Sequence, residues 1–266
     1  MENIEHTIKV AHLSDTHLGY QAYGAVSSSG RNQRSVDIAT AFKQAIDQII
    51  ETDPPLVIHS GDLAERSKPD TVWMQIARIE LTRLAGIRPD GTRRQVVVIG
   101  GNHDMPARHL DMCWLTHSLA GIPGLHLAES NPQRFRFEPE LLNCDPDLSH
   151  VEVVAVPHEA LKTLTREGWE SVQPNEKTPI SILAAHGVAG GSGLFRRSLG
   201  REWSIPTDLL VAGWDYVALG HWHRRGPIDG PAGSRAWYAG STENMGFGDV
   251  RDNGDRRGWY EVSLNS

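Results

Sequence analysis

The sequence has little cysteine and no long hydrophobic run, and each absence excludes a class of protein. Only Cys113 and Cys144 occur among 266 residues, which is too few for a disulfide framework and fits a reducing compartment. No stretch approaches the roughly 20 apolar residues that span a bilayer. The first residues, Met1 to Lys9, are not the apolar block of a secretion signal. We therefore expect a cytoplasmic protein with no membrane partner.

The sequence also lacks an excess of positive charge. Lysine and arginine number 26 against 33 acidic residues, so the formal net charge is −7. Proteins that bind the nucleic-acid backbone usually carry a basic face. Such a substrate would therefore need a local basic patch or the charge of bound metal ions. Histidine, in contrast, is abundant: there are 13, and histidine is the commonest transition-metal ligand.

Apolar runs predict strands that alternate with helices in an α/β protein. Strands and the helices between them are expected, in order, at Thr7–Leu13, Ser35–Glu51, Leu56–His59, Asp70–Ala85 and Gln95–Ile99. This order predicts parallel strands joined by helical crossovers. Five later strands are expected at Val151–Val156, Ile180–Ala185, Tyr216–Leu219, Ala236–Ala239 and Gly258–Leu264. Because no long linker interrupts this pattern, we predict a single domain over residues 1–266 without an evident capping domain.

Apolar residues at helical spacing predict which face of each helix is buried. The first helix should bury Ala39, Phe42, Ile46 and Ile49. The second helix should bury Val72, Ile76, Ile79 and Leu84. Three tryptophans are interpreted as core or surface aromatics rather than as platforms for stacked bases: Trp73, Trp114 and Trp169.

Polar residues able to bind a metal ion follow most of the predicted strands. They are Asp15, His17, Asp62, Asn102, His186, His221 and His223. In open α/β sheets, ligands bind outside the carboxyl ends of the strands, where the following loops converge. Separate segments of the chain can therefore bring these imidazole, carboxylate and amide donors into one cavity.

Each of these motifs has an ordinary structural interpretation when it is taken alone. The first Asp-x-His pair is commonly part of a solvated loop, and Gly61-Asp62 is commonly a turn. Asn102 or Asp104 could cap a following helix, and a lone histidine such as His186 is more often a core or surface residue. Five such elements in order, each at the end of a strand, favour a metal site over these interpretations.

The motifs follow one another from about Val10 to His223 as Asp-x-His, Gly-Asp, Gly-Asn-His-Asp, His and Gly-His-x-His. This order resembles the calcineurin-like metallophosphoesterase superfamily. Within it, three stretches are similar to the SbcD-type DNA-repair exonucleases: His12–Tyr20, Tyr216–His223 and Tyr238–Ser241. The resemblance implies a four-layer α-β-β-α sandwich of two mixed sheets.

The resemblance also implies a role for each site residue. A first metal ion would be held by Asp15, His17 and His223 and a second by Asn102, His186 and His221, with Asp62 bridging them. Mn²⁺ is the preferred metal, and Fe²⁺ or Zn²⁺ also suits these donors. His103 would protonate the leaving group as general acid, and Asp104 would orient or charge-stabilise it. The alternative for His103 is a structural role beside the ligands. The eight other histidines, including His59 and His158, are interpreted as structural.

Two features depart from the pattern of this branch. Glu65 stands three residues after the bridging aspartate, where these nucleases often have histidine or aspartate. It could contact substrate through water, or it could be surface charge. Arg196, Arg197 and Arg201 follow a glycine-rich stretch between two predicted strands. They could bind phosphate at the edge of the cleft, or they could belong to a solvated loop.

These features predict a two-metal phosphodiester hydrolase, and the resemblance favours a DNA exonuclease or endonuclease of the SbcD-like type. It implies DNA as the substrate and an SbcC-type ATPase as a possible partner, although only about 40 residues follow His223. The alternative is a small-molecule or cyclic-nucleotide phosphodiesterase with the same metal core. A non-catalytic scaffold is less favoured, because scaffolds tend to lose ligands and the full set is present.

Overall fold

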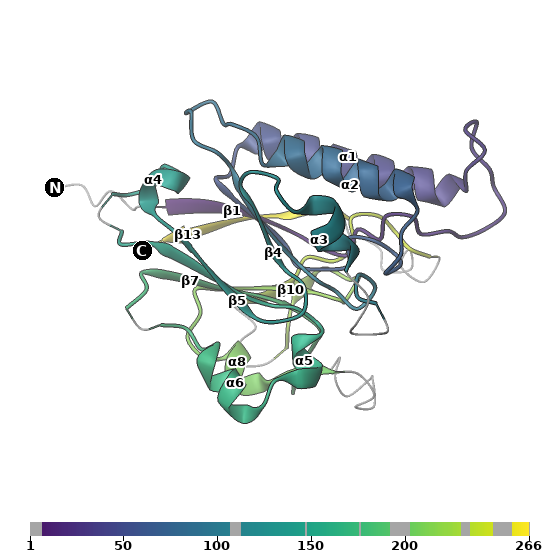
Figure 1. Cartoon of the computed structure of the whole chain (residues 1–266). Coiled ribbons are helices and arrows are strands. Elements are labelled where there is room, and N and C mark those ends of the chain that lie inside the picture. Colours follow the sequence, from purple (N-terminus) through teal and green to yellow (C-terminus); the bar gives the residue numbers. More distant parts are fainter. Residues whose placement is uncertain are drawn as a thin grey trace.

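The structure, a computed structural model, consists of two β-sheets packed face to face with helices on both outer faces (Figure 1). The described residues are 7–106, 113–146, 148–175, 177–191, 203–229, 235–246 and 257–265. Three hydrophobic clusters fill the space between the four layers, one between the sheets and one under each helical layer. The predicted four-layer α-β-β-α sandwich is therefore confirmed.

The first sheet has five strands and contains the first half of the predicted elements. Its strands, in spatial order, are β13 (Tyr260–Asn265), β1 (Thr7–Leu13), β2 (Leu56–His59), β3 (Gln95–Ile99) and β4 (Leu125–Ala128). Strands β1 to β4 are parallel, and β13 pairs with β1 in the antiparallel sense. β4 was absent from the prediction because its short, half-buried sequence Leu-His-Leu-Ala has no clear period.

The second sheet has six strands, and its centre is also parallel. Its strands, in spatial order, are β11 (Gly226–Pro227), β12 (Ala236–Tyr238), β10 (Tyr216–Gly220), β7 (Ile180–His186), β6 (Val151–Val156) and β5 (Gln133–Phe137). The two outer strands, β11 and β5, are antiparallel to their neighbours. A separate parallel pair is formed by β8 (Val188–Ala189) and β9 (Ser204–Ile205).

The inner strands are buried on both faces, which explains their continuous apolar sequences. In β3, Val97 and Ile99 pack between the sheets, where Val153 of β6 also lies. Val96 and Val98 point the other way, toward the upper helices. Because successive side chains point to opposite faces of a strand, β3 contributes side chains to two separate hydrophobic cores.

Seven described helices cover the outer faces and one edge of the two sheets. They are α1 (Gln33–Thr52), α2 (Thr71–Leu84), α3 (Trp114–Leu119), α4 (Pro139–Leu142), α5 (Ala160–Thr163), α6 (Arg166–Ser171) and α8 (Thr207–Leu210). Figure 1 shows α1 and α2 above the first sheet and α5, α6 and α8 below the second. α4 reaches the core between the sheets through Leu142. The long helices pack on the sheet that carries the first ligand motifs.

The two long helices test the predicted buried faces, and one prediction is wrong. In α1 all four predicted side chains are buried. In α2 Leu84 is buried as predicted, and Val72 and Ile76 are partly buried against the core. The centre of the buried face runs through Trp73, Ala77 and Leu81, and Ile79, predicted to be buried, is 58% exposed. The Trp73 indole packs so closely on Gly19 that a Cβ atom there would lie 2.7 Å from the ring. Burying this large side chain turns Ile79 toward solvent.

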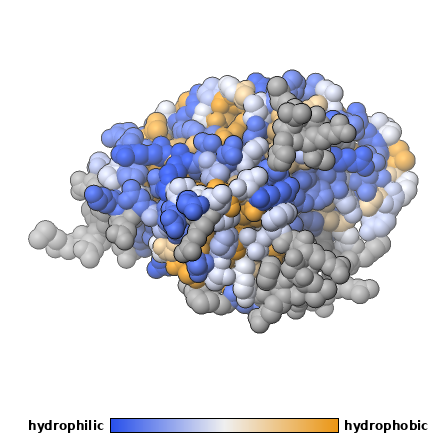
Figure 2. Space-filling view, turned by 60° about the horizontal axis from the view of Figure 1, so that its bottom comes forward, coloured by the Kyte–Doolittle hydropathy of each residue, from blue (hydrophilic) through white to orange (hydrophobic). Residues whose placement is uncertain are grey.

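The outer surface is mostly hydrophilic. Figure 2 shows one face on which hydrophilic residues predominate and hydrophobic residues form several separate groups. Among the described residues, no helix has the length and apolar character needed to cross a membrane.

A buried histidine joins the two sheets behind the predicted site. His12, on β1, is fully buried, and its Nδ1 is hydrogen-bonded with the Tyr216 hydroxyl of the second sheet at 2.8 Å. Its Nε2 is hydrogen-bonded with Ser60 Oγ at 2.9 Å. Burial, reinforced by the neighbouring charge of His59, lowers the pKa of His12 from its ordinary value of 6.5 to about 3. The ring is therefore neutral in the folded protein at neutral pH.

This pKa predicts that His12 contributes to unfolding by acid. Between pH 6.5 and about 3 the unfolded state binds the proton and the folded state does not, so stability falls as the pH is lowered through this window. His12→Asn should cost about 1–3 kcal/mol at pH 7, because it breaks buried hydrogen bonds, and should reduce the slope of stability against pH. Urea unfolding between pH 7 and pH 5, with EDTA present, measures both. The exposed His117→Asn is the control, and an unchanged slope in His12→Asn would contradict the assignment.

Candidate metal centre

All seven predicted ligands lie at the carboxyl ends of five parallel strands, where the two sheets meet. Six of them follow β1, β2 and β3 in the first sheet and β10 in the second, and His186 is the last residue of β7. The backbone there is unusual: Asp15, His17 and Asp62 have φ near +50°, and His221 has φ of 102°. Positive φ in residues other than glycine is costly and persists where surrounding contacts enforce it, often at functional sites. Here Asp15 N donates to the Gly61 carbonyl, and His17 N donates to the Asp62 carbonyl, both at 3.0 Å.

The first group of donors surrounds His17, which is 1% exposed. His17 Nε2 lies 3.1 Å from His223 Nε2 and 3.6 Å from Asp62 Oδ2. Donor atoms of Asp15, His17 and His223 all lie within 4.8 Å of one another. On the outer side of the ring, His17 Nδ1 donates to Glu65 Oε2 at 2.9 Å. This bond directs the Nε2 lone pair toward the other donors.

The second group of donors surrounds Asn102. Its Oδ1 lies 2.9 Å from His221 Nδ1 and 3.1 Å from His186 Nε2. His186 Nε2 is also 3.3 Å from Asp62 Oδ2. His186 Nδ1 donates to the Ser60 carbonyl at 2.7 Å, so its Nε2 lone pair faces the centre. One oxygen, Asp62 Oδ2, thus faces an imidazole of each group.

The donor sets fit two divalent ions that share a carboxylate. With metal–ligand bonds of roughly 2.0–2.2 Å, neighbouring ligands of one ion lie roughly 3 Å apart, and the shortest spacings within each group are of this size. Ligand histidines almost always donate their outer N–H to a carboxylate or carbonyl. His17 and His186 both do so.

The charges of the site also favour cations. Burial alone would raise the pKa of Asp62, but the neighbouring His186 and His17 outweigh it and lower that pKa. Burial lowers the pKa of His186, but the Asp62 carboxylate outweighs it and raises the pKa to about 9. Without metal, protons on the histidines neutralise the carboxylate, and binding of a divalent ion displaces such protons.

The two residues predicted to act in proton transfer have different surroundings. The His103 side chain is 38% exposed, and its Nδ1 donates to the Glu65 carbonyl at 2.8 Å. Asp104 is fully buried, and its oxygens accept the backbone N–H groups of Leu63, Ala64 and Gly101 at 3.0–3.1 Å. The geometry therefore assigns the orienting contact on His103 to Glu65. Asp104 instead joins the loop after β2 to the loop after β3.

Glu65, whose role the sequence left open, holds two histidines at once. Its carboxylate accepts from His17 and its backbone carbonyl accepts from His103. Its side chain is 23% exposed, at the edge of the site. The residue is thus a positioning group of the centre and more than surface charge.

Glycines allow the loops to approach this closely. A Cβ atom on Gly101 would overlap the Asp62 carboxylate, and one on Gly220 would overlap the Ser60 carbonyl. Gly101 and Gly220 therefore stand where any larger residue would separate Asn102 or His221 from the shared aspartate.

His158, which the sequence assigned to structure alone, lies beside the second group. Its ring stacks on His221 with centroids 6.2 Å apart and meets the His186 ring edge-on at 6.1 Å. Its backbone N donates to the Gly100 carbonyl at 2.9 Å. Burial, then the charges of His186 and His221, lower the pKa of His158 to about 3. The sequence does carry a signal for this position. His158 stands two residues after β6, and the predicted ligands likewise stand at or just after the ends of their strands.

Arg257, also missed by the sequence, supports the first group from behind. Its guanidinium donates to the His223 carbonyl, to Ser241 Oγ at 3.1 Å and to Asn244 Oδ1 at 2.8 Å. No motif marked this arginine, because its role depends on the return of the chain toward β13.

The remaining predicted residues have other positions. Arg196, Arg197 and Arg201 lie outside the described residues. His59 is buried, and its Nε2 is hydrogen-bonded with Thr16 Oγ1 at 2.9 Å. Of the three tryptophans predicted to be core or surface aromatics, Trp73 and Trp114 are buried and Trp169 is partly buried.

The sandwich and its clustered donor side chains are those of a metal-dependent hydrolase. Residues 8–225 match the family described as calcineurin-like phosphoesterase, and the chain belongs to that family. The family implies divalent metal ions, and the donor clusters described above suit them.

Individual relatives and one solved structure are similar along most of the chain. The DNA double-strand break repair protein Mre11 of Saccharolobus solfataricus is 29% identical over 245 residues, which are 90% of this chain and 55% of that protein. One subunit of the nuclease SbcCD from Bacillus subtilis is 26% identical over 97% of this chain and 70% of that protein. The calcineurin-like phosphoesterase YfkN of Bacillus subtilis shares the fold, with a TM-score of 0.51, 13% identity and coverage of 98% of this chain and 90% of that one. The chain spans about half the length of the Mre11 relative.

The shared carboxylate predicts how the centre responds to loss of one charge. The wild-type chain should bind about two divalent ions. Asp62→Asn should weaken both, because Oδ2 faces both donor groups. Elemental analysis and titration calorimetry measure this, with the exposed Asp208→Asn as a control for the lost charge. Loss of one ion with the other unchanged would argue against sharing.

The stacked ring predicts a selective effect of His158. His158→Ala should weaken the second ion by about 10- to 100-fold, the usual effect of removing a group that orients a ligand. The first ion should be affected much less, because the ring contacts of His158 are with His186 and His221 of the second group. His158→Phe should restore the affinity if stacking is the cause. Equal weakening of both ions in calorimetry would point to general damage.

Proposed function

We propose that the chain is a divalent-metal-dependent phosphodiesterase that cleaves DNA. The observation that carries the proposal is one buried carboxylate oxygen, Asp62 Oδ2, facing two groups of neutral and anionic donors. His103 lies beside them, and its side chain is 38% exposed; a group that meets substrate must be accessible. The match to the phosphoesterase family supports the reaction class.

We propose Mn²⁺ as the metal, because a mixture of imidazole, carboxylate and amide donors suits it, although Fe²⁺ and Zn²⁺ suit the same set. Bound ions of this kind activate water and neutralise the phosphate oxygens. Asp15, His17 and His223 would hold one ion and Asn102, His186 and His221 the other, with Asp62 between them.

His103 would supply the proton that the leaving group needs. Its Nδ1 donates to a carbonyl, which accepts only, so Nε2 is the nitrogen available to substrate. The water oxygen forms a bond to phosphorus, and the bond to the leaving oxygen breaks with its electron pair on that oxygen. The Nε2 proton then completes the alcohol, and the proton released from water restores the imidazolium.

Two observations support DNA as the substrate. The relatives that match most of the chain are named as a DNA repair protein and a nuclease. Arg66, Lys68 and Lys162 are among the described residues that line a groove beside the site. The net charge of −7 favours the alternative, a small-molecule or cyclic-nucleotide phosphodiesterase. The single-domain organisation and an SbcC-type partner stay predictions, although one relative is by name part of a larger nuclease.

A panel of substrates with Mn²⁺ tests the proposal. Single- and double-stranded DNA, bis-p-nitrophenyl phosphate, p-nitrophenyl phosphate and cyclic nucleotides should be compared. Hydrolysis of DNA and of the small diester is the expected result. Hydrolysis of the small diester or of cyclic nucleotides without DNA would favour the alternative.

The proton-transfer role predicts a dependence on the leaving group. His103→Ala should lower kcat by roughly 10²–10⁴ on DNA, whose alkoxide leaves poorly. The defect should shrink on bis-p-nitrophenyl phosphate, because p-nitrophenolate needs little protonation. Metal content should stay near that of the wild type, and the exposed His117→Ala serves as the control. An equal defect on both substrates would mean that His103 does not act by donating a proton.

A further inference from the structure

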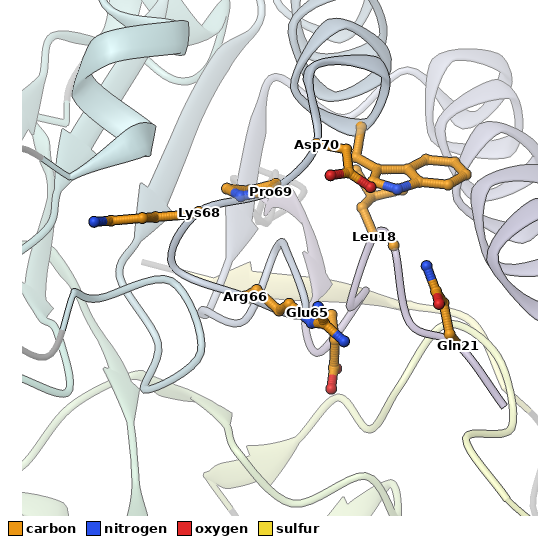
Figure 3. Close-up of a pocket in the computed structure, with 9 residues that line it drawn as sticks. Leu18, Gln21, Glu65, Arg66, Lys68, Pro69 and Asp70 are labelled. Carbon is orange, nitrogen blue, oxygen red and sulfur yellow. The ribbon is translucent and has the colours of Figure 1, made fainter.

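A groove of about 810 Å³ opens beside the centre, within the roughly 300–1,000 Å³ typical of ligand sites. One wall is the loop after β2, with Arg66 and Lys68. The other wall is the start of α5, with Glu159 and Lys162. The same loop borders a smaller hollow on the side of Leu18. Figure 3 shows Lys68 extending from this loop away from Leu18 and Gln21.

The groove carries positive charge on an acidic protein. Among the described residues, three basic side chains and two acidic ones line it. Both acids are engaged: Glu159 accepts from Lys162 at 2.7 Å, and Glu65 accepts from His17 at 2.9 Å. Arg66 and Lys68 add a guanidinium and an ammonium group to the described lining, and such groups suit a ligand with more than one phosphate.

The predicted ligands meet the groove at one point. Of the seven, Asn102 alone is among the described residues that line it, beside His103 and Glu65. The groove thus begins at the residue that faces the leaving oxygen. In an in-line displacement, water enters from the opposite side of the phosphorus. The part of the substrate attached to the leaving oxygen therefore continues past His103.

We propose that this groove binds the leaving strand of a phosphodiester polymer, with Arg66 and Lys68 on its phosphates. The inference rests on the proposed function and adds direction to it. The strand released with a free hydroxyl lies between the β2 loop and α5, and the part that keeps the phosphate lies elsewhere. Affinity should therefore depend on length on the hydroxyl side of the cut.

Two series of single-stranded oligonucleotides test this inference. Each has one cleavable linkage, with phosphorothioates at the others to retain charge. One series is lengthened on the side released with a hydroxyl and the other on the side that keeps the phosphate. Mass spectrometry of the cleavage products shows which side is which. In the wild type, lengthening the hydroxyl side by a few nucleotides should lower KM about tenfold, as expected for added charged hydrogen bonds.

The double variant R66Q/K68Q should lose that gain, and each single variant should lose part of it. The slope of log KM against log salt should fall by about 0.7 for each phosphate contact removed. The control R136Q/K177Q removes two positive charges outside the groove and should keep the gain. If R66Q/K68Q instead lost a decrease in KM that comes from lengthening the phosphate side, or lost it equally on both sides, the groove would not be the site of the hydroxyl-side strand. A wild type that fails to hydrolyse bis-p-nitrophenyl phosphate with Mn²⁺ would instead overturn the proposed function, and this inference with it.

Discussion

The buried carboxylate of Asp62 is the group on which the arrangement of the site depends. A charge removed from water is costly unless it is paired and hydrogen-bonded. Asp62 is 2% exposed, and its Oδ1 accepts the backbone N–H of His103 while its Oδ2 faces His17 and His186. Those partners come from both sheets. Pairing this one charge therefore requires the carboxyl ends of the strands in both sheets to lie side by side. Two adjacent metal ions would require the same arrangement.

Other contacts hold the loops in this position. Asp104 accepts three backbone N–H groups from the loops that carry Asp62 and Asn102. Across the sheets, the Asp15 carboxylate accepts the backbone N–H of His221 at 3.0–3.1 Å. Burial, with the nearby charge of Asp62, raises the pKa of Asp104 to about 6, while its three backbone donors oppose the shift. The loops are thus joined by buried carboxylates that accept backbone N–H groups from neighbouring loops.

Most of the fold could be predicted from the sequence, and so could the convergence of the seven predicted ligands at one end of the strands, because both depend on local patterns. The strands at Thr7–Leu13, Leu56–His59 and Gln95–Ile99 have the predicted bounds, since apolar runs that end in polar motifs are clear signals. The face of α2 could not be predicted, because burial of Trp73 decides it and depends on the loop at Gly19. The contacts of Glu65, Asp104 and Arg257 were equally out of reach. They join segments that only the tertiary fold brings together.

The two halves of the centre have unequal surroundings, and this inequality bears on how a substrate enters. Around the first half, Glu65 holds His17, and Arg257 holds the backbone of His223 from behind. Around the second half, His158 supports His221, but Asn102 reaches the wall of the groove. In the proposed function, a phosphate that enters beside Asn102 would meet His103, which is 38% exposed, before it met the buried Asp15 and His17. Rigid ligands and an accessible proton donor are separate requirements, and different residues would meet them.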